Sequence, residues 1–313
     1  MGTFHSTPPT LIALDWGTTS LRAYLMATNG MLLERKSAPL GILKVLDKNF
    51  DAAFEETCGP WLKNDLQAVP ILACGMIGSR QGWLEAPYVS CPVRIDQLAE
   101  KLISLTTKRG RRVVIVPGIN TKNSAGIPDV IRGEETQIFG ALSSDVSQQL
   151  FVLPGTHSKW VQVNENRIDH FATFMTGEVF AILCEHSILG RTMKSTTDDV
   201  TRFKQGFDYA MNEGVNKAGL LQQLFSARTL ALFNHVPADG LHAYLSGLLI
   251  GSEIFGALEL FGGENEITII AEPSLAQRYQ RALSFVRIPA SIANENVTAT
   301  GLFRIAQAAK LLK

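Results

Sequence analysis

The sequence predicts an α/β protein built from two similar lobes. Apolar runs typical of buried strands alternate along the chain with segments that have the helical spacing of apolar residues. One strand–turn–strand pattern opens both halves of the chain, at residues 11–27 and again at residues 150–163. A length of 313 residues suits two domains of ordinary size. We therefore expect a first lobe at residues 1–148 and a second at residues 149–313.

The first lobe is expected to begin with a three-stranded antiparallel meander. Asn29-Gly30 is a strong signal for a two-residue hairpin turn between the second and third strands. Beyond the meander, continuous apolar runs predict strands covered on both faces, and amphipathic runs predict helices. The predicted strands are 11–15, 21–27, 31–35, 71–75 and 113–117, and the predicted helices are 50–66, 95–105 and 134–142.

The second lobe is expected to open with a similar meander and then to be mainly helical. The predicted strands are 150–153, 159–163, 167–174, 267–271 and 286–289, and the predicted helices are 220–233, 240–260, 275–283 and 297–312. The last of these helices could pack back on the first lobe.

The two opening hairpins share the residues at their turns. Aligning Gly17 with Gly155 also aligns two hydroxyl side chains in each half. The aligned pairs are Thr18 with Thr156 and Ser20 with Ser158. Two unrelated hairpins with a common turn would look the same, and that alternative stays open.

These turns have the residues that hold phosphate groups in proteins. Glycine lets the backbone approach a ligand closely, and successive N–H groups with nearby hydroxyls can cradle phosphate oxygens. The candidate phosphate-binding residues are Gly17, Thr18, Thr19 and Ser20 in the first turn, and Gly155, Thr156, His157 and Ser158 in the second. Asp15 precedes the first turn and could hold Mg²⁺ through water. The alternative is that Asp15 only ends a strand.

Phosphoryl transfer also benefits from a carboxylate that accepts the proton of the attacking hydroxyl. Glu134 and Glu135 begin a predicted helix shortly before the second hairpin, and both are candidates for this base. Acidic residues in a first helical turn are also favoured by the helix dipole, so one of the two could be purely structural.

Composition argues against several other classes of function. The 29 basic residues balance the 29 acidic ones, so no broad field for nucleic acid or an anionic membrane is expected. The four cysteines form no CxxC pair and no zinc spacing, which favours reduced thiols in a cytoplasm. Met1 to Thr10 has no signal-peptide pattern, and no run of eighteen apolar residues predicts a membrane span.

Several segments resemble known families. Residues 15–22 and 155–158 are similar to the two phosphate motifs of the superfamily of acetate and sugar kinases, heat-shock chaperones and actin. Residues 133–140 resemble a catalytic segment of glycerol and xylulose kinases, whose aspartate corresponds to Glu134, or to Glu135 after a one-residue shift. Further similarity, over nearly the full length, is to the 2-dehydro-3-deoxygalactonokinase family. The segments that carry it are 73–83, 131–137, 153–160 and 174–178.

The resemblance implies two ribonuclease H-like, actin-like ATPase lobes with a cleft between them. ATP and Mg²⁺ would bind there, with the sugar held by the first lobe and adenosine by the second. The implied reaction is phosphorylation of 2-dehydro-3-deoxy-D-galactonate at its 6-hydroxyl, in galactonate catabolism. Two departures from the superfamily pattern are Leu153, where an aspartate is usual, and Ala271-Glu272-Pro273-Ser274 in place of a glycine-rich adenosine motif. The second departure leaves the adenine contacts undefined.

A sugar acid carries a carboxylate, which arginine binds with two parallel hydrogen bonds. Arg80 follows a predicted strand and a glycine-rich turn, and is the first candidate, with Arg132 and Arg191 in reserve. Trp83 and Tyr88 could form an apolar wall for the sugar, although aromatic residues are more often core. Ser79 and Gln81 could hydrogen-bond to hydroxyls.

Three alternatives remain at this stage. The first is a kinase for another sugar acid or a ketose. The second is a non-catalytic sugar- and ATP-binding protein of the same fold, such as a repressor, for which residues 1–10 leave no room for a DNA-binding motif. The third is an actin-like ATPase that binds protein. The sequence leaves a homodimer open.

Overall fold

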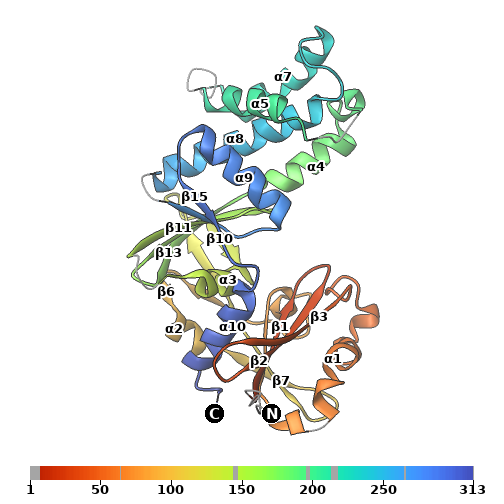
Figure 1. Cartoon of the computed structure of the whole chain (residues 1–313), viewed down its shortest axis with the longest axis vertical. Coiled ribbons are helices and arrows are strands. Elements are labelled where there is room, and N and C mark those ends of the chain that lie inside the picture. The colour runs from red at the N-terminus through yellow and green to blue at the C-terminus, as the bar shows by residue number, and fades with distance from the viewer. Residues whose placement is uncertain are drawn as a thin grey trace, which may run out of the picture. The chain divides into compact units, whose positions relative to one another are not determined.

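The computed structural model describes residues 8–63, 65–143, 147–194, 198–212, 218–263 and 266–312. The chain forms two compact units (Figure 1). Unit 1 contains residues 1–147, 164–170 and 294–313, and unit 2 contains residues 148–163 and 171–293. Two segments expected in the second lobe, 164–170 and 294–313, thus belong to unit 1.

Unit 1 is built on a six-stranded sheet with the order β3-β2-β1-β4-β8-β7. Strands β1 to β3 form the antiparallel meander, β1, β4 and β8 run parallel, and β7 lies antiparallel at the edge. The strands are β1 (Pro9–Trp16), β2 (Leu21–Ala27), β3 (Leu32–Ala38), β4 (Ile71–Cys74), β7 (Ile103–Thr106) and β8 (Arg112–Ile115). This arrangement confirms the predicted meander and the strands predicted at 71–75 and 113–117.

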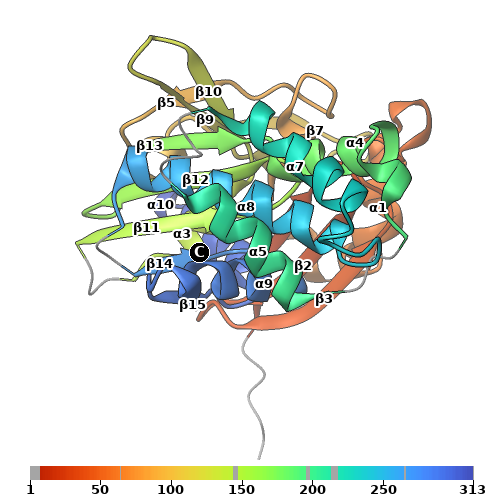
Figure 2. The same ribbon diagram turned by 90° about the horizontal axis from the view of Figure 1, so that it is seen from above.

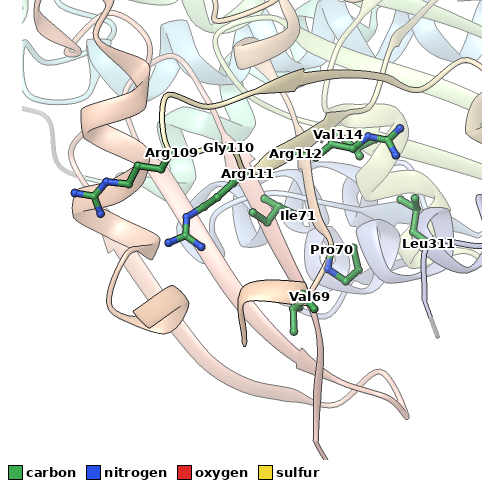
Figure 3. Close-up of a pocket in the computed structure, with 10 residues that line it drawn as sticks. Val69, Pro70, Ile71, Arg109, Gly110, Arg111, Arg112, Val114 and Leu311 are labelled. Carbon is green, nitrogen blue, oxygen red and sulfur yellow. The ribbon is translucent and has the colours of Figure 1, made fainter. Parts of the chain in front are cut away.

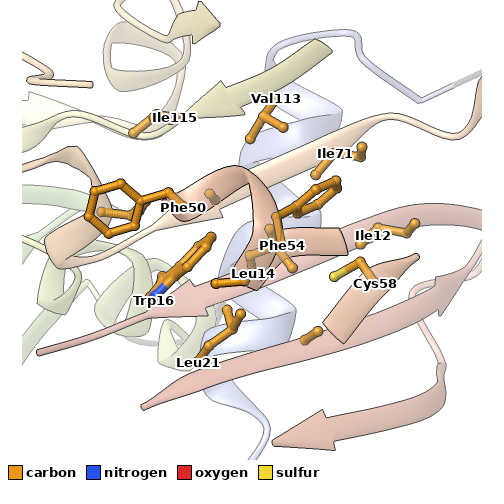
Figure 4. Packing of buried hydrophobic residues seen from close by; sticks show 14 of the residues in the cluster. Ile12, Leu14, Trp16, Leu21, Phe50, Phe54, Cys58, Ile71, Val113 and Ile115 are labelled. Atoms are coloured by element: carbon orange, nitrogen blue, oxygen red, sulfur yellow. The ribbon is translucent and has the colours of Figure 1, made fainter. Parts of the chain in front are cut away.

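Strand β1 lies in the core of unit 1, which explains its continuous apolar sequence. Its residues are buried along the strand apart from Pro9 and Asp15, as expected for a strand covered on both faces. Trp16 packs edge-on against Phe50, with 5.8 Å between ring centroids (Figure 4). Phe54 and Leu14 belong to the same cluster (Figure 4). Asp15 is therefore a polar interruption at the carboxyl end of an otherwise apolar strand.

Several α-helices and a small second sheet also belong to the described part of unit 1. The helices are α1 (Phe50–Cys58), α2 (Ile95–Ala99), α3 (Glu134–Ala141) and α10 (Val297–Ala308). The small sheet has the order β10-β9-β5, from β5 (Tyr88–Ser90), β9 (Gly118–Lys122) and β10 (Pro128–Ile131). Helix α10 packs closely on α3, because a Cβ at Gly140 would lie 1.8 Å from the Val297 carbonyl oxygen. The C-terminal helix therefore belongs to the unit that contains α3.

Unit 2 repeats the strand plan of unit 1. Its sheet has the order β15-β14-β11-β12-β13, which matches β8-β4-β1-β2-β3 strand for strand. The strands are β11 (Gln148–Leu153), β12 (Ser158–Asn164), β13 (Arg167–Phe174), β14 (Ile267–Ile269) and β15 (Ala290–Ile292). Strands β11, β14 and β15 run parallel, as β1, β4 and β8 do. In unit 1, the short β6 (Val93–Arg94) pairs with the first residues of β13.

A group of helices occupies the rest of unit 2. They are α4 (Thr176–His186), α5 (Val200–Met211), α7 (Leu220–Leu232), α8 (Leu241–Phe261) and α9 (Pro273–Phe285). Helix α8 contacts α4, α5, α7 and α9, and Figure 2 shows it beside α5 and α7. It is the one helix among the described residues that is long and apolar enough to cross a membrane, and 61% of that stretch is buried inside the protein. Its burial is typical of a core helix.

Three element predictions were wrong in their extent. The helix predicted over 50–66 ends at Cys58, because Pro60 cannot continue it and only short 3₁₀ turns follow. The helix predicted over 95–105 ends at Ala99, and residues 103–106 form β7, where two apolar residues alternate with two hydroxyl residues. The strand predicted over 286–289 lies at residues 290–292, because α9 continues to Phe285. The small β5-β9-β10 sheet was not predicted at all.

Candidate active site

The first hairpin holds Asp15 at the carboxyl end of β1, directly before the turn at residues 17–20. One oxygen of Asp15 lies 3.2 Å from Nη1 of Arg22 on β2. Burial is the main cause that raises the pKa of Asp15, the Arg22 charge opposes it, and the Glu134 charge adds to it. The negative charges of Asp15 and Glu134 therefore repel each other at the carboxyl edge of this sheet.

A neighbouring loop braces the turn of the first hairpin. The amides of Ile42 and Leu43 donate to the carbonyl oxygens of Gly17 and Thr18, at 3.0 and 3.2 Å. Gly41 lies so close that a Cβ there would be 2.3 Å from the Thr19 nitrogen. Thr18 and Thr19 remain exposed, while Gly17 and Ser20 are half-buried. The turn is therefore held from behind, and its two threonines face solvent.

Two glycines bring the start of α3 to the end of β4. Gly133 has a φ of 106°, a conformation that favours glycine, and a Cβ there would lie 3.1 Å from the Gly75 Cα. Gly75 follows β4 with a φ of 89°, and a Cβ there would lie 2.9 Å from the Trp16 carbonyl oxygen. The ends of β1 and β4 and the first turn of α3 therefore meet at one place, with Asp15 among them.

The two candidate glutamates occupy different environments in this first turn. Glu134 is half-buried and accepts a hydrogen bond of 2.9 Å from the Arg132 amide. Glu135 is fully buried and accepts from the Gly133 amide at 2.6 Å and from the Thr136 hydroxyl at 2.9 Å. Burial, and then the Glu134 charge, raise the pKa of Glu135 to about 8, against the lowering effect of its hydrogen bonds. A carboxyl that holds its proton at neutral pH is a poor base, so Glu134 is the better candidate.

The pKa of Glu135 predicts a pH dependence of stability. The unfolded chain releases this proton near the ordinary value of 4.5 and the folded chain near 8, so the folded state binds more protons between them. Stability should therefore fall as pH rises through this window, by about 1.4 kcal/mol per unit for one proton. In Glu135→Gln we expect that component of the slope to disappear, measured by urea unfolding between pH 5 and pH 8. Identical slopes in both proteins would show that Glu135 is ionised in the folded state.

The second hairpin turns between β11 and β12 in unit 2. Thr156 and His157 are exposed and Gly155 is half-buried, so three of the four predicted phosphate-binding residues are accessible. Ser158 is fully buried instead, and its hydroxyl donates to Oε1 of Glu253 at 2.6 Å. We therefore assign no phosphate contact to the Ser158 side chain.

Glu253 holds the start of β12, next to the turn of this second hairpin, and this role was not predicted from the sequence. It lies on α8, is 2% exposed, and also accepts from Nε1 of Trp160 at 2.8 Å and from the Tyr279 hydroxyl at 2.6 Å. Burial raises the pKa of Glu253, although the four side-chain hydrogen bonds that it accepts lower it. The signal in the sequence is an acidic residue in the middle of the long apolar run of α8.

The start of α4 supports the turn itself. The Glu178 amide donates to the Thr156 carbonyl oxygen at 2.9 Å, and the Glu178 carboxylate pairs with Nε2 of His157. A Cβ at Gly177 would lie 2.3 Å from the Gly155 carbonyl oxygen. At Gly155 the situation is opposite, because a Cβ there would meet nothing within 4 Å.

Alanine substitutions at Gly155 and Gly177 should therefore have different effects. Gly155→Ala should fold normally and raise the KM for ATP by about tenfold or more, because the methyl group would occupy space needed by a phosphate. Gly177→Ala should lower thermal stability, because its methyl group collides with backbone. Melting temperatures and ATP saturation curves of both variants check this. An unchanged KM in Gly155→Ala would remove the turn from the phosphate site.

The predicted sugar-binding residues differ in their surroundings. Ser79, Arg80 and Gln81 follow β4 and its short 3₁₀ turn, on the same edge as Asp15, and Arg80 and Gln81 are exposed. The buried Ser79 hydroxyl makes no hydrogen bond to the part of the chain that the structure describes. Trp83 is partly buried against the core, 5.9 Å from Trp16 between ring centroids, so we assign it no sugar contact.

The other two candidates, Tyr88 and Arg132, form a pair of their own. Tyr88 is 44% exposed on β5, with the guanidinium carbon of Arg132 4.4 Å from its ring centroid. Arg132 is buried and donates from Nη2 to the Ala86 carbonyl oxygen at 2.8 Å. Its Nε and Nη1 atoms have no hydrogen-bond partner within the described ranges. Arg191 lies in unit 2, in the short 3₁₀ turn that follows α4.

One cavity of unit 1 lies at the opposite edge of the sheet. It has a volume of about 310 Å³ and is lined in part by Ile71 and Arg112, the first residues of β4 and β8 (Figure 3). In open α/β sheets, ligands bind outside the carboxyl ends of the strands. Arg109 and Arg111 at this cavity are already paired with Glu55, at 2.9 and 3.3 Å. We therefore do not assign the cavity to the active site.

The fold and these residues define a class of protein. Two α/β units share one strand order, each with a glycine–threonine hairpin, and one has a carboxylate pair beside its hairpin. This is the two-lobed, actin-like ATPase fold of carbohydrate kinases. Residues 15–305 match the family model described as 2-keto-3-deoxy-galactonokinase. The chain therefore belongs to the 2-keto-3-deoxy-galactonokinase family and is a carbohydrate kinase by class.

Individual relatives agree with this assignment. The chain is 34% identical over 298 residues to the 2-dehydro-3-deoxygalactonokinase of Escherichia coli strain K12, covering 95% of this chain and 97% of the relative. A crystal structure from Sinorhizobium meliloti, provisionally named a 2-dehydro-3-deoxygalactonokinase, superposes with a TM-score of 0.80. It is 30% identical, with coverage of 95% of this chain and 98% of that one.

A more distant structure is similar in fold alone. The activator of 2-hydroxyisocaproyl-CoA dehydratase from Clostridium difficile, with bound ADPNP, has a TM-score of 0.51 at 10% identity. Coverage is 97% of both chains.

Proposed function

We propose that this protein transfers the terminal phosphoryl group of ATP to the 6-hydroxyl of 2-dehydro-3-deoxy-D-galactonate, in galactonate catabolism. The observation that carries the proposal is the convergence of Asp15 and Glu134 at the carboxyl edge of the first sheet, in a chain of this family. We place the protein in the cytoplasm with small-molecule substrates as its partners, and we propose no nucleic-acid or membrane partner.

Phosphate binding is assigned to the two hairpin turns. The backbone amides and exposed threonines of residues 17–19 and 155–156 offer N–H and O–H donors, and His157 offers a ring nitrogen. Such donors stabilise negative charge on phosphate oxygens without covalent help, which is the main requirement of phosphoryl transfer. The Cβ-sized space at Gly155, which the fold itself does not fill, supports a close approach of ligand there.

Asp15 is the residue that we expect to hold Mg²⁺. No group of three or more His, Cys, Asp or Glu side chains in the described part of the chain could hold a metal by itself. Mg²⁺ usually retains several waters and uses one or two carboxylates together with substrate phosphates, so a single half-buried aspartate beside the phosphate turn fits it. Bound there, the ion would neutralise charge on the transferring phosphate.

Glu134 is the proposed base. It is half-buried, close enough to Asp15 to raise the pKa of that carboxyl, and its position is fixed by the Arg132 amide. In the reaction, Glu134 accepts the proton of the 6-hydroxyl as that oxygen attacks the terminal phosphorus. Glu135 keeps its own proton and shapes the first turn of α3 through its two hydrogen bonds.

Arg80 is the proposed anchor of the substrate carboxylate. It is exposed on the segment after β4, and among the described residues no carboxylate pairs with it. Arg80→Gln should raise the KM for the sugar acid by about 10- to 100-fold with a smaller change in kcat, because a charge-assisted contact is lost. Steady-state kinetics at saturating ATP check this. An unchanged KM would move the anchor to Arg132, whose two unpaired nitrogen atoms make it the next candidate.

The function is tested by ADP release from ATP and Mg²⁺ with four compounds offered separately. They are 2-keto-3-deoxygalactonate, 2-keto-3-deoxygluconate, galactonate and xylulose. We expect strong stimulation by the first compound alone. Stimulation by another compound would preserve the kinase and change its substrate, while ATP binding without stimulation by any of them would contradict the proposal.

A further inference from the structure

A second cavity lies in the helical part of unit 2, away from the hairpin. It has a volume of about 510 Å³, within the range of about 300–1,000 Å³ that small-molecule sites occupy. Its walls come from the end of α7, the start of α8, α5 and the segment that follows α4. Its lining includes the cations Arg191, Lys194, Arg202 and Arg228, together with His235.

No acidic residue is among the described residues that line this cavity. No salt bridge joins Arg191, Lys194, Arg202 or Arg228 to an acid in the part of the chain that the structure describes. Two nearby carboxylates have other partners: Asp198 pairs with Arg278 and Arg281, and the Asp199 side chain accepts from the backbone amide of Arg202. A third, Asp239, is exposed beside the lining residue Ala238 and forms no salt bridge with these cations in the described part of the chain. Four permanent positive charges therefore face one cavity in a protein whose net charge is zero.

One of these cations is held in place by its neighbours. The stem of Arg202 lies over Gly240, where a Cβ would come within 2.7 Å of its Cγ. Nη1 of Arg202 donates to Oε1 of Gln205 at 2.9 Å, which orients the guanidinium without neutralising it. Arg202 and Arg228 are both half-buried, so their charges are screened less by water than those of exposed side chains.

The cavity of unit 1 differs from this one because its arginines are paired with a carboxylate. There, Arg109 and Arg111 share the carboxylate of Glu55, so the local charge is largely balanced. Among the described residues of unit 2, no salt bridge offsets the repulsion between these like charges, and a bound anion would reduce it.

We propose that the cavity in unit 2 is a binding site for a small phosphorylated anion that carries at least two negative charges. Arginine guanidinium groups bind phosphate and carboxylate oxygens with paired hydrogen bonds, and cations from several elements can surround a compact polyanion. This site is distinct from the phosphate turns at residues 17–20 and 155–158, and the inference does not rest on the proposed reaction.

The test uses 3-phosphoglycerate as the probe, since it combines a phosphate with a carboxylate. Isothermal titration calorimetry is done on the whole protein saturated with a non-hydrolysable ATP analogue and Mg²⁺, so that the nucleotide site is filled. We expect one equivalent to bind, with an affinity that falls as salt is raised. Arg202→Gln and Arg228→Gln should each weaken binding by about 10- to 100-fold.

Arg112→Gln is the matched control, because it removes an exposed cation from the cavity of unit 1 and should leave the affinity unchanged. Arg191→Gln, at an exposed position, serves if either half-buried arginine proves necessary for folding. Failure of the saturated wild-type protein to bind 3-phosphoglycerate at millimolar concentration would overturn the proposal. So would an affinity that the substitutions at the unit 2 cavity do not change.

Discussion

Replacing Glu134 with glutamine is expected to lower kcat by about 10²- to 10⁴-fold, the usual contribution of a positioned general base. Glutamine has nearly the same shape, and its carbonyl oxygen can still accept the 2.9 Å hydrogen bond from the Arg132 amide. The fold of the first turn of α3 should therefore survive. Because the lost proton acceptor acts only in the transition state, the KM values for ATP and sugar acid should change by less than about threefold.

The adjacent glutamate supplies the control for this experiment. Glu135→Gln removes a carboxyl that is already protonated at neutral pH, with a pKa of about 8, so most of the activity should remain. Both variants are compared by initial rates at saturating ATP, Mg²⁺ and sugar acid. An active Glu134→Gln together with an inactive Glu135→Gln would move the base by one position.

Asp15→Asn is expected to have the second large effect. We expect kcat to fall by about 10²- to 10³-fold at ordinary Mg²⁺ concentration, because amide oxygens hold a divalent cation and its waters less strongly than a carboxylate does. The concentration of Mg²⁺ needed for half-maximal rate should rise as well. A titration of rate against Mg²⁺ at fixed ATP measures both quantities.

Arg22→Gln is the matched control for Asp15. It removes the guanidinium that lies 3.2 Å from the Asp15 carboxylate, and Arg22 itself is 36% exposed. The Arg22 side of this pair is partly exposed, so the variant should fold, and because it keeps the Asp15 carboxylate it should need far less Mg²⁺ than Asp15→Asn does. If Asp15→Asn retained the Mg²⁺ dependence of the wild type, Asp15 would be only the end of a strand.

The sequence predicted the local features of this fold well. The hairpins at 9–27 and 148–164 have strong short-range signals, which are continuous apolar strands and turns that contain glycine and threonine. The matching strand orders of the two sheets support the repeat that the turn residues suggested. The small sheet of unit 1 escaped prediction because its strands are short, two of them beginning at Gly118 and Pro128.

Contacts between distant residues account for what the sequence could not predict at the site. Ser20 and Ser158 occupy equivalent positions in the two turns, yet Ser158 bonds to a carboxylate 95 residues away and is buried by it. Trp83 is of a residue type that often stacks on sugar rings. Its ring instead packs against Trp16, Phe50 and Phe54 of the core. The different environments of Glu134 and Glu135 likewise follow from packing, because both residues belong to one helical turn.

The product of the reaction tests the account most directly. Wild-type protein is incubated with ATP, Mg²⁺ and 2-keto-3-deoxygalactonate, and the product is examined by phosphorus–proton correlation NMR. The account predicts one phosphorylated product, whose phosphorus couples to the two protons on C6. Phosphorus coupled to a proton on any other carbon, or inorganic phosphate released without a phosphorylated sugar acid, would contradict it.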